Sequence, residues 1–139
     1  MQKTWFARGL AALALFAGGY ATGLKAHAPV PDDSPQRVEQ QRTELTGAPS
    51  MEVVASIAEY HKGEGIARHL HHGVEAAYVI QGSMVQMPGK DPMPLPTGKS
   101  IVNLRDVAHA GFTVVGDEPL KLYTVHVVDK GKPLYDYVP

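Results

Sequence analysis

Residues Gly63–Gly82 read GEGIARHLHHGVEAAYVIQG and place three potential metal ligands within seven positions. One residue separates His69 from His71, and three residues separate His71 from Glu75. In a β-strand, residues i and i+2 point to the same face and lie about 7 Å apart at the backbone. The imidazoles of His69 and His71 can therefore converge on one ion at roughly 2.1 Å. The stretch predicts a strand that carries the first half of a metal site.

Glu75 has the same parity as the two histidines, but in a continuous strand it would lie about 13 Å beyond His71. The chain must therefore reverse between them if they are to share an ion. The three intervening residues can form this turn, because Gly73 is free to adopt a positive φ. We expect Glu75 to open a return strand on which Ala77 and Val79 share its face.

The remainder of the chain predicts short strands joined by turns. Fourteen Gly and eleven Pro favour tight turns over long helices. Four prolines predict a loop over Pro88–Gly98, because proline is excluded from central strands. With no convincing amphipathic helix, we expect an all-β sandwich or barrel. The predicted strands are Met51–Tyr60, Ala76–Gln81, Met84–Met87, Ser100–Leu104, Gly111–Val115 and Leu120–Val128.

The amino-acid composition excludes several classes of function. The 139 residues suit one domain, and 44% hydrophobic content can supply a packed core. The net charge of −1 and the absence of a Lys/Arg block, a P-loop or a zinc-finger spacing predict no nucleic-acid partner. The absence of Cys excludes disulfides, thiolate nucleophiles and thiolate metal sites.

The N-terminus predicts export. Lys3 and Arg8 precede the apolar run Leu10–Ala17, and no Asp or Glu occurs before Asp32. Residues 1–28 are therefore interpreted as a signal peptide, which predicts a periplasmic or extracellular protein. The alternative is an uncleaved anchor over Gly9–Leu24, which is short for a membrane span. Residues 29–42 are predicted to be a polar, Pro-rich linker, and residues 43–139 the folded domain.

A fourth metal ligand is expected from elsewhere in the domain, and His109, in a turn between two predicted strands, is the best candidate. Three His and one Glu would hold one divalent transition-metal ion (Fe, Mn, Ni, Zn or Cu) and leave positions open for water or substrate. His126 lies in a predicted strand and is either a substrate contact or an ordinary strand histidine. His72 has the opposite parity to the ligands and is expected to be an exposed turn residue.

The stretch resembles the first motif of the cupin superfamily, G-x5-H-x-H-x3-E-x6-G. Gly63, His69, His71, Glu75 and Gly82 occupy every fixed position of that motif.

The second cupin motif, G-x5-P-x-G-x2-H-x3-N, is partly present. Gly98 and His109 have the correct spacing, whereas Leu104, Asp106 and Thr113 replace the motif's Pro, Gly and Asn. The departures affect turn residues and leave the ligands in place.

The resemblance implies a single-domain, cupin-type jelly-roll (double-stranded) β-barrel with a metal in its mouth, and frequent homodimers. It implies an exported metal-dependent enzyme acting on a small molecule, with a dioxygenase as the first class to test and an isomerase or lyase next. In such an enzyme Glu75 would stay a ligand or act as a catalytic base. The alternative is a non-catalytic periplasmic metal- or ligand-binding module or sensor. The apolar tail Pro133–Val138 either forms part of a homodimer interface or folds over its own barrel.

Overall fold

The structure is a computed structural model that describes residues 33–109 and 111–139. All regular elements in these ranges are β-strands, which confirms the predicted all-β class. No described segment forms a helix long and apolar enough to cross a membrane. The predicted signal peptide or anchor, residues 1–28, lies outside the described residues.

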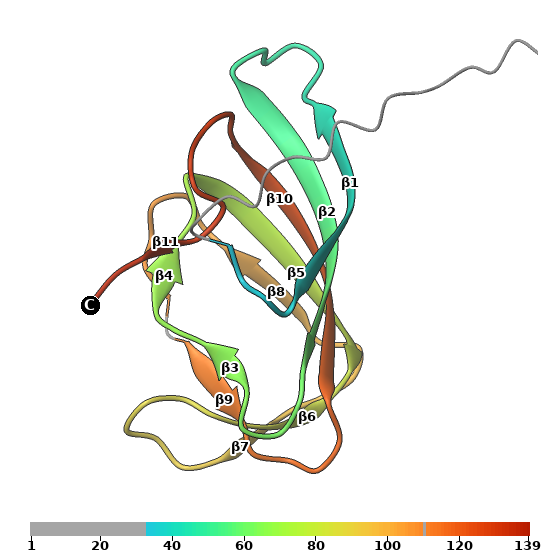
Figure 1. Ribbon diagram of the computed structural model, residues 1–139, viewed down its shortest axis with the longest axis vertical. Coiled ribbons are helices and arrows are strands. Elements are labelled where there is room, and N and C mark those ends of the chain that lie inside the picture. Colours follow the sequence, from blue (N-terminus) through green and yellow to red (C-terminus); the bar gives the residue numbers. More distant parts are fainter. Residues whose placement is uncertain (1–32, 110) are drawn as a thin grey trace, which may run out of the picture.

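The larger sheet has five antiparallel strands in the order β1-β2-β10-β5-β8 (Figure 1). Its strands are β1 (Arg37–Glu44), β2 (Met51–Tyr60), β10 (Leu120–Asp129), β5 (Gly73–Gln81) and β8 (Ser100–Asn103). β2 has the predicted bounds, and β5 begins three residues earlier than predicted.

Two smaller sheets form the second layer. One has four strands in the order β3-β9-β6-β7, and the other pairs β11 with β4. Figure 1 shows β4, β11, β3 and β9 facing the larger sheet, as in a jelly roll. The three sheets remain separate in their ladder hydrogen bonds over the described ranges, so the predicted barrel is an open one. The bounds are β3 Gly65–Ile66, β4 His69–Leu70, β6 Ser83–Gln86, β7 Met93–Leu95, β9 Phe112–Val114 and β11 Asp136–Tyr137.

The core lies between the two layers and follows the alternation of the strands. In β5, Glu75, Ala77 and Val79 are buried, whereas Tyr78 and Ile80 are exposed, which confirms the predicted face. One buried cluster fills the end near β9, and a smaller one fills the end near the C-terminus. The first contains Ala58, Tyr60, Val79, Val85, Val114, Leu120 and Leu122, and the second Val54, Val128, Leu134 and Tyr135.

Two predicted irregular segments contain strands. The linker prediction is wrong from Arg37 onward, because β1 pairs with β2 along its length. β1 is polar, and the ion pair between Arg42 and Glu52 connects this edge strand to β2. The loop prediction for Pro88–Gly98 is wrong over β7, which pairs with β6 at the edge of its sheet. Proline is excluded from central strands but not from edges.

Candidate metal centre

The chain bends between β4 and β5 and passes from a small sheet into the larger one, as the reversal before Glu75 required. The prediction of a positive φ at Gly73 is wrong, because Gly73 is the first residue of β5 and is not among the residues with positive φ. A Cβ at Gly73 would lie 2.1 Å from the Val127 carbonyl oxygen. Glycine is therefore needed here for the close approach of β5 to β10.

His109 reaches the site through backbone pairing with β4. The His109 amide donates to the His69 carbonyl at 2.9 Å, and the His69 amide donates to the His109 carbonyl at 3.3 Å. Upstream in the same loop, the Asp106 amide donates to the His71 carbonyl at 2.9 Å. Asp106 has a φ of 56° at the position of the second motif's Gly. Asp tolerates this left-handed conformation better than most residues, which explains the departure.

The structure brings the four predicted ligands together. The ring centroids of His69 and His71 lie 4.8 Å apart, and the His109 ring lies 4.2 Å from that of His69. Oε2 of Glu75 lies 3.2 Å from His71 Nε2 and 4.0 Å from His109 Nε2. Two overlapping sets have ligand atoms all within 4.8 Å of one another: His69, His71 and His109, and His71, Glu75 and His126.

The three predicted histidine ligands share one hydrogen-bonding arrangement. Each places Nδ1 on a backbone carbonyl, which can only accept, so Nδ1 carries the proton. In the neutral ring, Nε2 then presents its lone pair to the cluster, as a metal ligand requires. The carbonyls are Ala67 for His69 at 2.7 Å, Leu134 for His71 at 2.6 Å and Val107 for His109 at 3.3 Å.

Glu75 supplies the negative charge. Asn103 Nδ2 donates to its Oε2 at 2.6 Å, a contact that the sequence analysis missed. The feature that could have identified Asn103 is its place in the sheet. It lies opposite Glu75, on the less exposed face of a strand of alternating burial. Burial acts to raise the pKa of Glu75, but its contacts with His71, His126 and Asn103 outweigh burial and lower it to about 2. The carboxyl group is therefore an anion at neutral pH.

Burial also keeps His69 and His109 in the form that binds a metal. It lowers the pKa of His69 to about 4 and is the main cause of a lowered pKa for His109. Neutral imidazoles and a carboxylate are the protonation states that coordinate divalent transition metals.

His126 lies on the inner face of β10 and points toward the same carboxylate. Its Nε2 is 3.4 Å from Glu75 Oε1, and its ring centroid is 4.8 Å from that of His71. The side chain is fully buried, and burial lowers its pKa to about 4. His126 therefore lies on the inner wall of the domain, beside two of the predicted metal ligands.

The C-terminal tail folds over its own domain, which is the second of the two predicted alternatives. β11 pairs with β4, with Tyr137 opposite His69. The buried Tyr135 ring lies 5.0 Å from the His69 ring, 5.2 Å from that of His71 and 5.7 Å from that of His126. The tail is therefore part of the wall around the candidate ligands.

His72 is more constrained than predicted. Nδ1 lies 3.0 Å from an Asp106 carboxylate oxygen, and Nε2 lies 3.2 Å from one of Asp136. The ring therefore connects the loop that carries His109 to the C-terminal strand.

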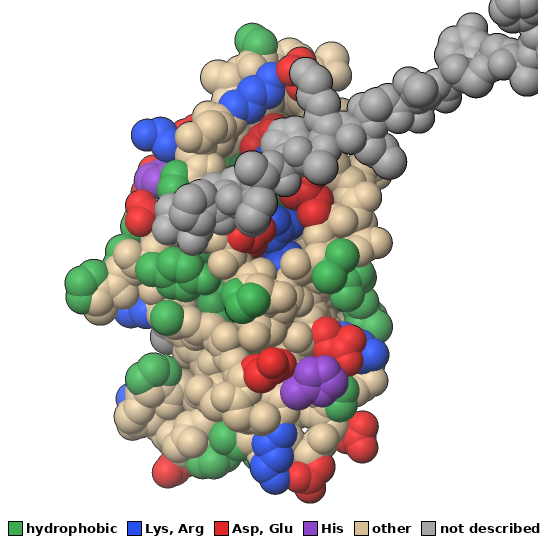
Figure 2. Space-filling view, viewed as in Figure 1, with side chains coloured by type: hydrophobic (Ala, Val, Ile, Leu, Met, Phe, Trp, Pro, Cys, Tyr) green, Lys and Arg blue, Asp and Glu red, His purple; other side chains and the backbone are tan. Residues whose placement is uncertain are grey.

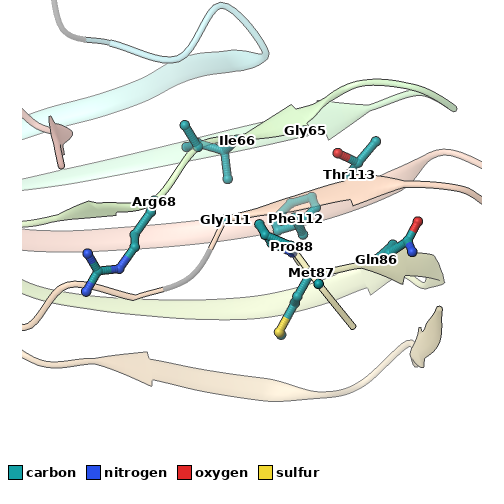
Figure 3. A pocket seen from close by; sticks show the side chains of 11 residues that line it. Gly65, Ile66, Arg68, Gln86, Met87, Pro88, Gly111, Phe112 and Thr113 are labelled. Carbon is teal, nitrogen blue, oxygen red and sulfur yellow. The ribbon is translucent and has the colours of Figure 1, made fainter. Parts of the chain in front are cut away.

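A separate pocket of about 410 Å³ opens beside the site (Figure 3). β3 and β9 and the segment after β6 line it, with Ile66, Met87 and Phe112 among the lining side chains. None of the candidate ligands lines this pocket, so it is distinct from the cluster.

A family model for the cupin domain matches residues 56–126, about half of the chain, and this range includes all the predicted ligands. No curated protein sequence matches the chain.

Solved structures share the fold at low identity. An uncharacterised Klebsiella pneumoniae protein with a double-stranded β-helix domain matches with a TM-score of 0.55 and 17% identity, over 76% of this chain and 89% of that one. A polyketide cyclase from Streptomyces resistomycificus matches with a TM-score of 0.53 and 17% identity, over 76% of this chain and 72% of that one. At these identities the similarity shows the fold alone.

Proposed function

Since the chain belongs to the cupin family, we propose that it binds one divalent transition-metal ion through His69, His71, Glu75 and His109 and uses it to act on a small molecule. The observation that carries this proposal is the convergence of three Nδ1-anchored imidazoles, whose ligand atoms lie within 4.8 Å of one another, beside one buried carboxylate 3.2 Å from His71.

The contact between His71 and Glu75 supports a cation at this place. Because Nδ1 of His71 donates to Leu134, Nε2 of the neutral ring has a lone pair directed at an acceptor oxygen 3.2 Å away. Two acceptors at this distance repel unless a positive charge lies between them, either a proton on Nε2 or a metal ion. Nε2 of His109 is buried with no hydrogen-bond partner among the described residues. A shared metal ion would satisfy both groups.

When bound, such an ion supplies Lewis-acid polarisation of a substrate oxygen and, for Fe, Mn or Cu, redox chemistry. The protein contributes neutral imidazole donors, one compensating negative charge and a buried setting. With a pKa of about 2, Glu75 is a weak base at neutral pH. Its primary role is therefore that of a ligand, with action as a catalytic base as the secondary role. A dioxygenase-type reaction is the first class to test, and its support is family analogy.

Elemental analysis of protein isolated from its native compartment tests the proposal. We expect about one transition-metal ion per chain, and loss of that ion in His71→Ala. Protein loaded with Fe, Mn, Ni or Cu should then consume oxygen with a member of a phenolic and thiol panel. Stoichiometric metal without oxygen uptake would remove the dioxygenase class and leave isomerase and lyase chemistry to test. Protein isolated without metal and unable to take it up would contradict the whole proposal.

A non-catalytic metal-binding or sensor module is the second candidate function. The Tyr135 ring, which packs edge-on against three histidines, favours it because it covers part of the cluster. Glu75→Gln distinguishes the two. In an enzyme the substitution abolishes a chemical conversion, whereas in a binding module only metal retention falls.

Export and homodimer formation also belong to the proposal. Lys3, Arg8 and the apolar run that follows support export to the periplasm or beyond. N-terminal sequencing of protein from the periplasmic fraction should find a start near residue 22 or 29, because cleavage of a signal peptide follows small residues such as Ala21 and Ala28. A homodimer remains a prediction. The apolar tail is no longer an argument for it, since Leu134 and Tyr135 are buried within their own chain.

A further inference from the structure

His126 has no hydrogen-bond partner for either ring nitrogen among the described residues, although its side chain is fully buried. A neutral imidazole carries one donor and one acceptor, and buried polar groups are rarely left unpaired. His126 faces Glu75 across the pairing of β10 with β5. Its unpaired nitrogens are therefore next to the one buried carboxylate of the site.

The distances around Glu75 match those between ligands of a common ion. Two donors each about 2.1 Å from one ion lie roughly 3.0–3.5 Å apart for angles of 90–110°. His126 Nε2 lies 3.4 Å from one Glu75 oxygen, and His71 Nε2 lies 3.2 Å from the other. A histidine that merely filled the core would not need this spacing.

We propose that His126 is an additional ligand of the metal ion, acting with His71 and Glu75. The inference rests on the proposed metal function and extends it. The interior then offers four imidazoles and one carboxylate, arranged as two triads that share His71. If all five coordinate, an octahedral ion keeps one position for substrate or water instead of two. A substrate would then bind through a single atom.

Cadmium-113 NMR tests the inference directly. Protein with 15N-labelled histidine is loaded with 113Cd, and scalar couplings from the metal to each assigned imidazole are measured. We expect couplings to His126 and to His71. Couplings to His69, His71 and His109 without one to His126 would overturn this inference and leave the proposed function intact. Failure to bind cadmium or any other divalent transition metal would overturn both.

An affinity measurement supplies an independent readout. His126→Phe keeps the ring volume and removes the donor, and His61→Phe is the matched control at an exposed position. Competition with a chromophoric zinc chelator should show at least a tenfold loss of affinity for His126→Phe and no change for His61→Phe. Unchanged zinc affinity in a folded His126→Phe protein would overturn the inference.

The outer face of the larger sheet is the surface through which the homodimer proposed above would form. Val38, Ile57, Tyr123 and Tyr78 form one row across four strands. Val102, in β8, continues the apolar face in the next row. Several of these side chains are strongly exposed, with Tyr78 at 49% and Val102 at 62%. In Figure 2 hydrophobic side chains reach the surface along the right-hand margin, on the side of the larger sheet.

The chemistry of this face favours a second copy of the chain over a charged partner. Its edge charges are compensated within the chain, with Lys121 3.3 Å from Glu59 and Arg105 2.9 Å from Asp129. Five strands about 4.8 Å apart and some six residues long give a projected area on the order of 500 Å². Because side chains protrude from the sheet, the accessible area is larger than this projected area. It approaches the roughly 800 Å² per partner of a stable interface.

In the proposed dimer, two chains would stack their larger sheets through these faces, as in a β-sandwich. Light scattering after size-exclusion chromatography should show a dimer for the full mature chain. Tyr78→Glu should give a folded monomer, whereas Val107→Glu, at an exposed loop position off this face, should stay dimeric. A monomeric wild-type protein at high micromolar concentration, or a dimer that persists in Tyr78→Glu, would overturn the inference. Flotation of a monomer with neutral lipid vesicles would assign the face to a membrane surface instead.

Discussion

Glu75 is the residue on which the candidate metal centre converges. One of its oxygens accepts from Asn103 at 2.6 Å and faces His71, and the other faces His126. The carboxylate is buried, so each contact acts with little screening by water. The site therefore depends on residues that orient Glu75 as well as on the ligands.

Asn103→Ala tests that orientation. Loss of the Asn103 amide donor to Glu75 should weaken zinc affinity by about 10- to 100-fold, the usual effect of removing a group that positions a ligand. Chelator competition measures the change. Ser100→Ala, on the same strand but facing outward, should bind zinc as the wild type does. Equal affinity in Asn103→Ala would show that Glu75 is held without this contact.

Substitutions at Asp106 measure the strain of its backbone conformation. Its φ of 56° lies in the left-handed region, where most non-glycine residues are strained by about 1–2 kcal/mol. Asp106→Ala and Asp106→Gly both lose the contact with His72, but only Ala retains the strain. We expect Asp106→Ala to be less stable than Asp106→Gly by about 1 kcal/mol in urea unfolding. Equal stabilities would show that the loop relaxes to another conformation.

The buried histidines predict acid sensitivity of the metal-free protein. Burial lowers the pKa of His126 from 6.5 to about 4, so between these values the unfolded chain binds a proton that the folded chain does not. Stability therefore falls as the pH decreases from about 6.5 to about 4, by about 1.4 kcal/mol per pH unit for this group. The stabilising contribution of the Glu75 carboxylate is lost only as the pH falls from 4.5 toward 2.

Urea unfolding of the metal-free protein at several pH values measures this slope. His126→Phe should flatten it, while the exposed His61→Phe should leave it unchanged. A stability that does not vary between pH 6.5 and 4 would mean that His126 is protonated in the folded state as well.

At the scale of elements, the C-terminal strand belongs to the metal centre. β11 pairs with the strand of His69, Leu134 accepts from His71, and Tyr135 packs on three histidine rings. A segment of a few residues thus fixes the orientation of two predicted ligands. Its role is structural support of the site, provided by the same chain.

Truncation after Lys132 should therefore destabilise the protein and weaken zinc binding together. Removing the buried Leu134 and Tyr135 should lower the free energy of unfolding by at least about 3 kcal/mol. Chelator competition at low temperature, where the truncated protein is folded, should show a lower affinity. Deletion of Pro139 alone is the control and removes only the contact with Arg68. A wild-type zinc affinity in the truncated protein would show that the tail does not contribute to the metal site.

At the scale of the whole molecule, metal binding should be coupled to folding. The candidate ligands come from β4, the segment between β4 and β5, β5, β10 and the loop after β8, and they meet only in the folded state. An ion that binds this state alone stabilises it by mass action, by about 2.7 kcal/mol at 100 times its dissociation constant. Thermal unfolding with and without zinc measures the shift. The double variant His69→Ala/His71→Ala should show none, and a shift that persists there would place the ion elsewhere.

The sequence alone determined the fold class, the inward face of β5 and the set of candidate ligands His69, His71, Glu75 and His109. These features depend on strand alternation and on fixed spacing, which are local properties of the chain. Alternation also placed His126 in a strand. It could not show β1 or β7, because polar residues and prolines are tolerated at sheet edges, where pairing depends on the neighbouring strand.

Only the tertiary structure decided how these residues meet. Gly73 is required by the close approach of β10, and Asn103 and His126 reach Glu75 through cross-strand register. The tail could lie over its own barrel or a partner, and its pairing with β4 settled that choice. Contacts of this kind join residues far apart in the sequence, 28 positions for Asn103 and Glu75 and 63 positions for Leu134 and His71. Register and packing fix them, and neither can be read from local periodicity.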